Sequence, residues 1–213
     1  MAEDTIHGNY IDKYHPRNPI ERHLVGCFLR EWGALVVSMQ KEHPVRRILE
    51  VGCGDGYLLD HTRRNAASVN PDDDITVGLE PGLDVVAPAV QSYPACRFVN
   101  GSIYTLPFPD NSFDLVTVPE VFEHLDDPSA GMAEVLRVTA KYVLASVPWE
   151  PVWRIMNMVR GAYWSDWGNT PGHLQHFTRL GFVRFITGKA KIRAIRRPFP
   201  WTMIFAEKTI SDT

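Results

Sequence analysis

The sequence predicts an α/β protein built around a mostly parallel β-sheet, and three observations lead to this fold class. Residues 48–51 form a short run that is apolar apart from Glu50, glycines follow at positions 52, 54 and 56, and a helical pattern opens at residue 57. Short apolar runs and helical stretches then alternate as far as residue 147, an order typical of strands joined by crossover helices. Two further runs, residues 192–197 and 201–207, are separated only by a short proline-containing turn, which predicts a closing hairpin.

The length, composition and charge of the chain limit the classes of function that are possible. The chain has 213 residues, a length that suits one domain with a sizeable core. Hydrophobic residues make up 45% and charged residues 22%, as in an ordinary globular protein. The net charge of −3 and the isoelectric point near 6.2 argue against a protein that binds nucleic acid through a basic surface. No nucleic-acid partner is therefore expected.

The three cysteines, Cys27, Cys53 and Cys96, are widely spaced and match no zinc-binding or redox motif. We expect them to be reduced thiols in a cytoplasmic protein. The sequence shows neither a signal-peptide pattern nor an apolar run of about 18 residues, so no membrane span is expected. A monomer or a homodimer is expected.

The glycine turn predicts a ligand site at the start of the first crossover helix. Glycines permit a close approach to a ligand, and the following helix directs free N–H groups at it. The G-x-G-x-G spacing differs from the G-x-G-x-x-G of dinucleotide sites, because Tyr57 follows Gly56. No Lys-Ser or Lys-Thr follows, which argues against a P-loop. We expect a nucleoside with an uncharged linker, and a plain glycine-rich connection is the alternative.

Glu80 supports the ligand-binding interpretation, because it ends the predicted second strand, residues 74–80. A carboxylate at this position of a βαβ unit can accept hydrogen bonds from both ribose hydroxyls. The sequence also predicts helices over residues 57–67, 84–92, 129–139 and 178–187, and strands over 96–99, 113–118 and 141–147.

The N-terminal residues 1–17 are polar and contain Tyr10 and Tyr14. A frayed end is one expectation for this segment. The other, closure over the cofactor and substrate, is implied by the family resemblance described below, and both stay open. Asn18 and Pro19 suit the N-cap and the first position of a helix, and apolar residues recur at helical spacing as far as residue 39. This helix is expected to pack against the sheet.

Residues 148–178 follow the fifth strand and contain four of the six tryptophans. Because ligands in open α/β sheets lie at the carboxyl ends of the strands, this segment is expected to form a lid over the site. Its aromatic side chains either pack on the domain or line a pocket for an apolar or aromatic substrate. The candidates for substrate contact are Tyr10, Tyr14, Trp149, Trp153, Tyr163 and Trp164.

Four segments together resemble the class I S-adenosylmethionine-dependent methyltransferases. They are residues 50–56 (EVGCGDG), 77–80 (VGLE), 106–116 (LPFPDNSFDLV) and 121–125 (VFEHL), and they occur in that family's order and spacing. The resemblance implies a Rossmann-like, doubly wound sheet of seven strands with an antiparallel C-terminal hairpin. It also implies S-adenosylmethionine as methyl donor and S-adenosylhomocysteine as product. The last segment is similar to the branch of quinone and secondary-metabolite methylases.

The resemblance further implies that the chain is one methyltransferase domain. Residues 1–44 would form an N-terminal cap and helix, and residues 45–147 the cofactor-binding core. The lid would span residues 148–178, and the last helix and closing strands residues 179–213.

Cofactor contacts carried over from the family fall on the glycine turn and on the ends of four strands. They are Glu50, Gly52, Cys53, Gly54, Gly56, Glu80, Pro81, Ser102, Ile103, Pro119 and Glu120. Ser102 stands where the family often has an acid that contacts the adenine amino group, so one polar contact is weakened, and Ile103 is expected against the adenine. The Asn/Asp-Pro-Pro-Tyr/Phe motif is missing after the fourth strand, which disfavours methylation of a nucleic-acid base or of a glutamine.

Three histidines are candidates for catalysis. His173 and His176 lie in the predicted lid, and His124 follows the fourth strand. One of them could take a proton from an acceptor hydroxyl or amine, or could instead fix a loop through hydrogen bonds. If Leu174 points into the core, the two lid imidazoles share a face. No third ligand at motif spacing supports a metal, so none is expected.

The predicted function is methyl transfer to a hydroxyl or amine of a small, apolar or aromatic metabolite. One alternative is a lipid-linked or macromolecular acceptor, attracted by Arg193, Arg196 and Arg197, although alternating arginines on an edge strand more often only prevent aggregation. Another alternative is a non-catalytic, S-adenosylmethionine-binding scaffold.

Overall fold

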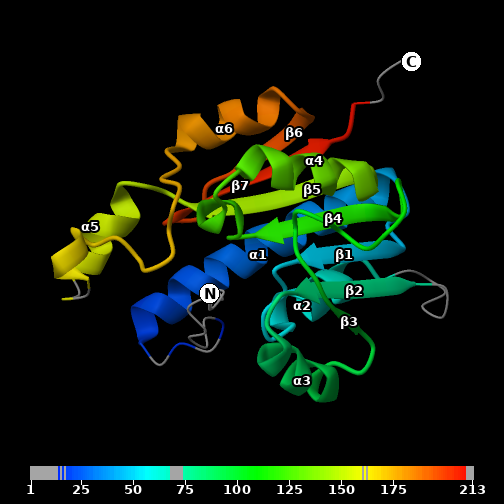
Figure 1. Cartoon of the computed structure of the whole chain (residues 1–213), viewed down its shortest axis with the longest axis horizontal. Coiled ribbons are helices and arrows are strands. Elements are labelled where there is room, and N and C mark those ends of the chain that lie inside the picture. Colours follow the sequence, from blue (N-terminus) through cyan, green and yellow to red (C-terminus); the bar gives the residue numbers. More distant parts are fainter. Residues whose placement is uncertain are drawn as a thin grey trace, which may run out of the picture.

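A seven-stranded sheet forms the centre of the molecule (Figure 1). The computed structural model describes residues 14, 16, 18–67, 74–159, 161 and 163–209. The strands are β1 (Arg47–Val51), β2 (Ile75–Glu80), β3 (Arg97–Asn100), β4 (Phe113–Pro119), β5 (Thr139–Pro148), β6 (Lys191–Arg196) and β7 (Trp201–Glu207). Their order is β3-β2-β1-β4-β5-β7-β6. The first five strands pair in parallel, and β7 runs antiparallel to both β5 and β6. The predicted α/β class and closing hairpin are confirmed.

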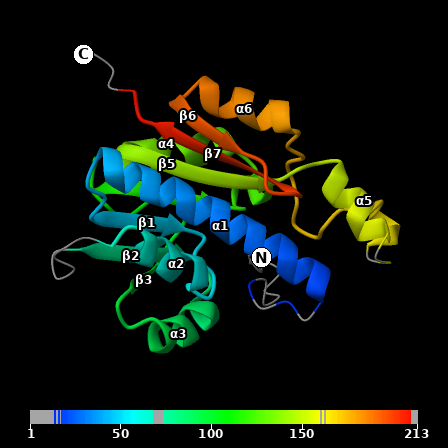
Figure 2. The same ribbon diagram turned by 180° about the vertical axis from the view of Figure 1, so that it is seen from behind.

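Helices cover both faces of the sheet (Figures 1 and 2). They are α1 (Pro19–Glu42), α2 (Tyr57–Asn65), α3 (Leu83–Ser92), α4 (Pro128–Val138), α5 (Val152–Val159) and α6 (Arg179–Thr187), with the short 3-10 helices η2 (Phe122–His124) and η3 (Trp164–Asp166). Helices α1 and α2 lie on one face, and α4 and α6 lie on the other. Helix α3 packs beside the edge strand β3, and α5 stands out at one end of the molecule.

Each face of the sheet has its own apolar core. Met132 of α4 and Phe182 of α6 are fully buried on one face, against β1, β2, β4 and β5. On the other face Trp32 of α1 is fully buried beside Leu58 of α2. The indole N–H of Trp32 donates to the Thr62 hydroxyl at 2.9 Å, so the buried polar atom that joins these two helices is satisfied.

The predicted helix starts are confirmed where a side chain caps them. The Asn18 side chain accepts a hydrogen bond from the Ile20 N–H at 2.9 Å, directly before Pro19. The Thr178 hydroxyl does the same for α6, accepting from the Gly181 N–H at 2.9 Å. Helix α4 begins at Pro128, one residue earlier than predicted, because the Asp127 carboxylate caps it.

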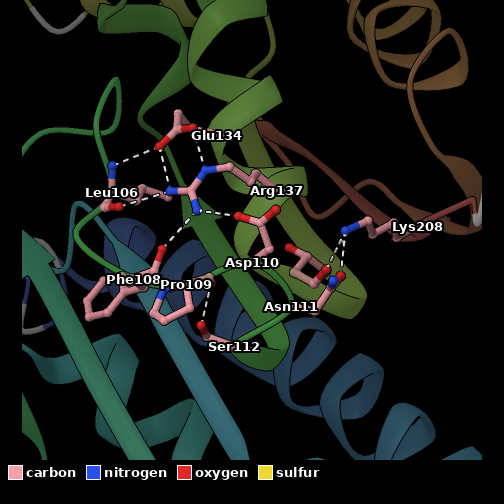
Figure 3. A network of polar contacts seen from close by, with 10 residues as sticks. Leu106, Phe108, Pro109, Asp110, Asn111, Ser112, Glu134, Arg137 and Lys208 are labelled. Atoms are coloured by element: carbon pink, nitrogen blue, oxygen red, sulfur yellow. Dashed lines mark hydrogen bonds and ion pairs between the residues drawn. The ribbon is translucent and has the colours of Figure 1, made fainter.

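The loop between β3 and β4 is fastened by Arg137 of α4 (Figure 3). Its guanidinium donates to the carbonyl oxygens of Leu106 and Phe108 at 2.9 and 2.8 Å. It also pairs with the Asp110 carboxylate at 2.8 Å and with the Glu134 carboxylate at 2.7 Å. This network holds the loop at the amino end of β4, the end opposite the glycine turn.

The edge strand β6 carries the arginines that could meet an anionic surface. Arg193 pairs with the carboxylates of Glu42 at 2.8 Å and Glu207 at 2.6 Å. Arg196 lies 3.3 Å from the Glu31 carboxylate. These charges are therefore largely neutralised within the chain. Within the described residues, no helix is both long enough and apolar enough to cross a membrane.

Candidate donor and acceptor site

The glycine turn lies at the carboxyl ends of β1 and β2. Gly52, Gly54 and Gly56 all have positive φ, at 73°, 51° and 83°, a backbone region that favours glycine. The N–H groups of Gly52 and Cys53 both donate to the Leu79 carbonyl, at 2.8 and 3.2 Å. These two hydrogen bonds fix the position of the glycine turn relative to β2.

The three glycines differ in what surrounds them. A Cβ on Gly52 would lie 2.5 Å from Val121 Cγ2, and one on Gly56 would lie 2.8 Å from Phe98 Cζ. At Gly54 no atom of the described residues lies within 4 Å of that position. The backbone of Gly54 therefore faces open space, where a ligand can approach it closely.

Glu80 lies beside this open space. Its side chain is buried, and Oε2 accepts a hydrogen bond from the Gly54 N–H at 3.1 Å. The Asn100 side-chain amide donates to the carbonyl oxygens of Glu80 and Pro81, at 3.1 and 2.8 Å. The carboxylate is thereby held at the tip of β2, as a ribose contact requires.

Glu50 brings a second carboxyl group to the turn. It is fully buried, and Oε2 accepts a hydrogen bond from the Thr117 hydroxyl at 3.0 Å. Its Oε1 has no hydrogen-bond partner among the described residues. Burial raises the pKa of Glu50 to about 8, and the nearby Asp55 charge adds to this, although the Thr117 hydrogen bond acts in the opposite direction. A buried acceptor atom of this kind would gain from a cationic ligand group.

Tyr14 lies beside the first residue of α2. Its ring stacks on Tyr57 with centroids 4.9 Å apart and an interplanar angle of 14°. Burial raises the pKa of the Tyr14 phenol well above its usual value, and the negative charges of Glu120, Glu50 and Asp55 raise it further. Tyr14 therefore lies near the glycine turn, whereas Tyr10 lies outside the described residues.

Other predicted cofactor contacts take different positions. The Cys53 side chain is buried against β2, since a Cβ on Gly78 would lie 2.6 Å from its Sγ. Burial raises the pKa of this thiol, and the negative charges of Glu50 and Glu80 raise it further. Ser102 is exposed, and its hydroxyl accepts from the Tyr104 N–H at 3.3 Å. Ile103 is buried in the core that α4 covers.

The end of β4 carries the remaining predicted contacts. Pro119 is buried and pairs with Ser146 of β5. Glu120 has a φ of 52°, and its N–H donates to the Ser146 carbonyl at 2.9 Å. The strand end is thus turned toward β5, which brings η2 under the lid.

The lid uses some of its aromatic residues for its own structure. The Trp153 indole N–H donates to the Thr170 hydroxyl at 2.9 Å, and its ring lies 5.9 Å from that of Trp201. The Arg179 guanidinium lies 3.5 Å from the Trp149 ring centroid. Trp164 is 66% exposed, while Tyr163 is half-buried where the chain turns into η3. Of the four predicted lid contacts, Trp149 and Trp153 thus have partners within the protein.

Backbone hydrogen bonds hold the base of the lid at two places. The Glu150 N–H donates to the Phe177 carbonyl at 3.0 Å, which joins the two ends of the lid. The N–H groups of Leu174 and Gln175 both donate to the Glu123 carbonyl, at 2.8 and 2.9 Å. The returning half of the lid therefore lies directly on η2.

This contact brings His124 and His173 together. Their ring centroids are 4.9 Å apart with an interplanar angle of 83°. His124 Nδ1 lies 2.9 Å from the Gly172 carbonyl, and His173 Nδ1 lies 3.6 Å from Glu150 Oε1. Glu123, Glu150 and His173 are 2%, 3% and 7% exposed, whereas His124 is half-buried.

His176 lies apart from this cluster. It is exposed, and its Nε2 lies 2.9 Å from the Asn169 side-chain oxygen. Leu174 is 47% exposed rather than buried, so the condition under which both lid imidazoles would share a face is not met. His173 lies against His124 and Glu150 instead, whereas His176 contacts Asn169. Glu123 and Glu150 were not predicted, although each is an acid in a largely apolar stretch at a strand end.

Comparison with known proteins places these features in a family. A family model described as a methyltransferase domain matches residues 49–143. A demethylmenaquinone methyltransferase of Renibacterium salmoninarum is 33% identical over 110 residues, 52% of this chain and 44% of that protein. A malonyl-[acyl-carrier protein] O-methyltransferase of Serratia marcescens is 30% identical over 139 residues, 65% of this chain and 51% of that protein. The chain thus spans about half the length of these curated relatives or less.

A solved structure shares the whole architecture. The magnesium protoporphyrin IX methyltransferase of Synechocystis, crystallised with S-adenosylhomocysteine, superposes with a TM-score of 0.66. The match covers 92% of this chain and 90% of that one at 13% sequence identity, so it speaks for the fold. The glycine turn, both strand-end carboxylates and the matched domain lead to the same assignment. Residues 49–143 thus match a methyltransferase domain, and the fold around them is the fold of an S-adenosylhomocysteine-bound methyltransferase.

Proposed function

We propose that the protein transfers a methyl group from S-adenosylmethionine to a hydroxyl or amine of a small, apolar or aromatic acceptor. The observation that supports this most is the open backbone at Gly54, flanked by the buried carboxyl groups of Glu50 and Glu80. A positively charged donor with a ribose and an amino group suits such a site. The demethylmenaquinone relative, by its name, acts on a small apolar molecule.

Each part of the donor has a partner in this proposal. The positive end of the α2 dipole faces the methionine carboxylate, whereas the N–H groups of Gly52, Cys53 and Gly54 are used in hydrogen bonds to β2. Glu50 Oε1, which lacks a partner in the described part of the chain, receives the donor's amino group. Glu80 binds the ribose hydroxyls. The protein's main task is then to hold the acceptor about 3 Å from the methyl carbon, in line with sulfur.

The cluster of His124, His173, Glu123 and Glu150 lies on the acceptor side of this arrangement. A carbonyl oxygen only accepts hydrogen bonds, so the contact with Gly172 places a proton on His124 Nδ1. In neutral His124 the lone pair is then on Nε2. The nucleophile is activated at this cluster, because its imidazoles can draw the proton from a hydroxyl or an ammonium group.

A carrier-bound acceptor is a second candidate, favoured by the relative named as a malonyl-[acyl-carrier protein] O-methyltransferase. Such an acceptor would reach the same cluster from outside the lid. Once donor binding is established, activity assays with free and with carrier-bound acceptors distinguish between these two candidates.

Calorimetric titration of the protein with S-adenosylmethionine and S-adenosylhomocysteine tests the proposal, with NAD as the control ligand. We expect both sulfur compounds to bind in the micromolar range and NAD not to bind. Glu80→Ala should weaken donor binding by about tenfold or more, since it removes charge-assisted hydrogen bonds. Glu42→Ala, an exposed acid on α1, serves as the matched control.

Two results would contradict the proposal in different ways. Unchanged donor affinity in Glu80→Ala would remove Glu80 from the ribose contact and leave the donor site in place. Failure of both sulfur compounds to bind a folded protein would reject methyl transfer as the function.

A further inference from the structure

We propose that Glu123, His124, His173 and Glu150 form a binding site for a divalent transition-metal ion, with Zn²⁺ as the best match. These residues come from three separate segments: η2 after β4, the start of the lid after β5, and the returning half of the lid. The inference concerns ion binding by itself and is tested without the methyl-transfer reaction. With the ion bound, the lone pair of His124 Nε2 is not available to take a proton from an acceptor, so ion binding and the base role are alternative states of one cluster.

The donor atoms are already close together. One ligand atom each from Glu123, His124 and His173 lies within 4.8 Å of the other two. Ligands bound to zinc at about 2.0–2.2 Å lie roughly 3.3 Å from one another. Side-chain movements on the order of 1 Å would therefore bring these three atoms into coordination distance.

Glu150 supplies the fourth ligand and an independent reason for an ion. Its Oε1 lies 3.6 Å from His173 Nδ1, which is too long for a hydrogen bond. Neither oxygen of Glu150 nor Nδ1 of His173 has a hydrogen-bond partner among the described residues, although both side chains are more than nine-tenths buried. Buried polar groups without partners are costly. An ion between Glu150 and His173 would satisfy both.

The surroundings hold the ligands in place. The Nδ1–H of His124 donates to the Gly172 carbonyl, which fixes the ring and leaves Nε2 as the ligand atom. Ligating histidines usually have such a partner on their second nitrogen. The backbone hydrogen bonds from Leu174 and Gln175 to the Glu123 carbonyl keep the lid segment against η2.

The chemistry of the ligands selects the ion. Two imidazole nitrogens and two carboxylates suit Zn²⁺ or Mn²⁺, whereas Mg²⁺ and Ca²⁺ prefer oxygen ligands alone. Residue spacing gave no third ligand for the lid histidines, because the remaining ligands come from other strand ends. A bound ion would fasten the lid to the core.

The test uses the full chain with Cys27→Ser, stripped of metal with EDTA. That substitution removes a competing surface pair, since Cys27 Sγ lies 3.6 Å from His23 Nε2. ZnCl₂, MnCl₂ and MgCl₂ are titrated separately, with affinity measured by competition with a chelating dye and stability by thermal unfolding. We expect one Zn²⁺ per chain, a raised Tm with Zn²⁺, and weak or no response to Mg²⁺.

Variants decide whether the proposed residues bind the ion. Glu123→Gln and His173→Gln should each weaken Zn²⁺ binding at least about tenfold, whereas His176→Gln, outside the cluster, should leave it unchanged. Zn²⁺ affinity that persists in both variants, or the absence of stoichiometric binding, overturns the proposal. If His173→Gln fails to fold by circular dichroism, Glu150→Gln decides in its place, because it keeps the side-chain shape and removes only the charge.

Discussion

At the scale of single residues, Glu50 combines burial with an ionisable group. The folded protein raises its pKa from the usual 4.5 to about 8, mainly through burial. Between these two pH values the folded state holds a proton that the unfolded state has lost. The free energy of unfolding therefore falls as pH rises through this window, and it levels off above about pH 8.

Glu50→Gln should remove this pH dependence, since glutamine cannot ionise. We expect the variant to be more stable than the wild type at about pH 9 and close to it at about pH 5. Chemical denaturation at both pH values, without ligand, measures the difference. Parallel pH profiles for the two proteins would show that Glu50 is not the titrating group.

If Glu50 binds the donor as proposed, donor affinity should change with pH in the direction opposite to stability. A carboxylate that binds the donor's amino group must first lose its proton, so donor affinity should rise as pH increases toward 8 in the wild type. Glu50→Gln should bind the donor more weakly and with little pH dependence. The same substitution thus strengthens the fold and weakens the site.

Gly54 differs from its neighbours because open space lies above it. Gly54→Val places a branched side chain in that space, at a φ of 51° that such residues rarely adopt. We expect loss of donor binding in calorimetry, while circular dichroism shows that the fold is retained. Gly26→Val in α1, where a Cβ also meets nothing within 4 Å, is the matched control. Normal donor affinity in Gly54→Val would mean that the donor lies elsewhere.

At the scale of elements, the loop before β4 depends on one side chain of α4. Arg137→Met leaves the carbonyl oxygens of Leu106 and Phe108 without their donor and separates two carboxylates from their cation. We expect a loss of about 2 kcal/mol in the free energy of unfolding, since these hydrogen bonds are charge-assisted.

Donor affinity should change little in Arg137→Met, because the loop lies at the end of β4 that faces away from the glycine turn. Urea denaturation and calorimetry on the same sample measure both quantities. Arg184→Met, an exposed arginine of α6, controls for the loss of charge. A large fall in donor affinity with no loss of stability would contradict this separation.

The elements themselves were largely predictable from the sequence. Capping residues such as Asn18 and Thr178 act within one helical turn, so local sequence carries the signal. The start of α4 was missed by one residue because Asp127, rather than a later residue, caps it. Where a strand ends, by contrast, depends on its neighbour's register, as in the one-residue shift of β3 to Arg97–Asn100.

At the scale of the whole molecule, the sequence relates the residues of the proposed donor half of the site more directly than those of the proposed acceptor half. The glycine turn and Glu80 belong to adjacent parallel strands of one βαβ unit, so their meeting follows from the order of the chain. The acceptor half joins Glu123, Glu150 and His173 from three segments. No spacing rule relates these positions, because their distances depend on how the lid folds back over η2.

The lid also shows what the sequence pattern left open. Its tryptophans suggested a wall for the acceptor, but the indole of Trp153 is bonded to Thr170, and Trp167 is 76% exposed. An aromatic-rich stretch predicts apolar contacts, but it does not indicate whether they are made with a substrate or within the protein. Part of the aromatic surface of the lid is buried by contacts within the protein. These contacts depend on the folded chain and cannot be read from the sequence.

The hydrogen bond between the Glu150 N–H and the Phe177 carbonyl makes the two ends of the lid meet. Doubling the length of a loop adds only about 0.6 kcal/mol to the entropic cost of bringing its ends together. The stretch between them can be lengthened, shortened or exchanged without pulling on β5 or α6. Natural selection can therefore refit this protein for a new acceptor by replacing one continuous piece of chain, while the sheet and the donor site are inherited unchanged.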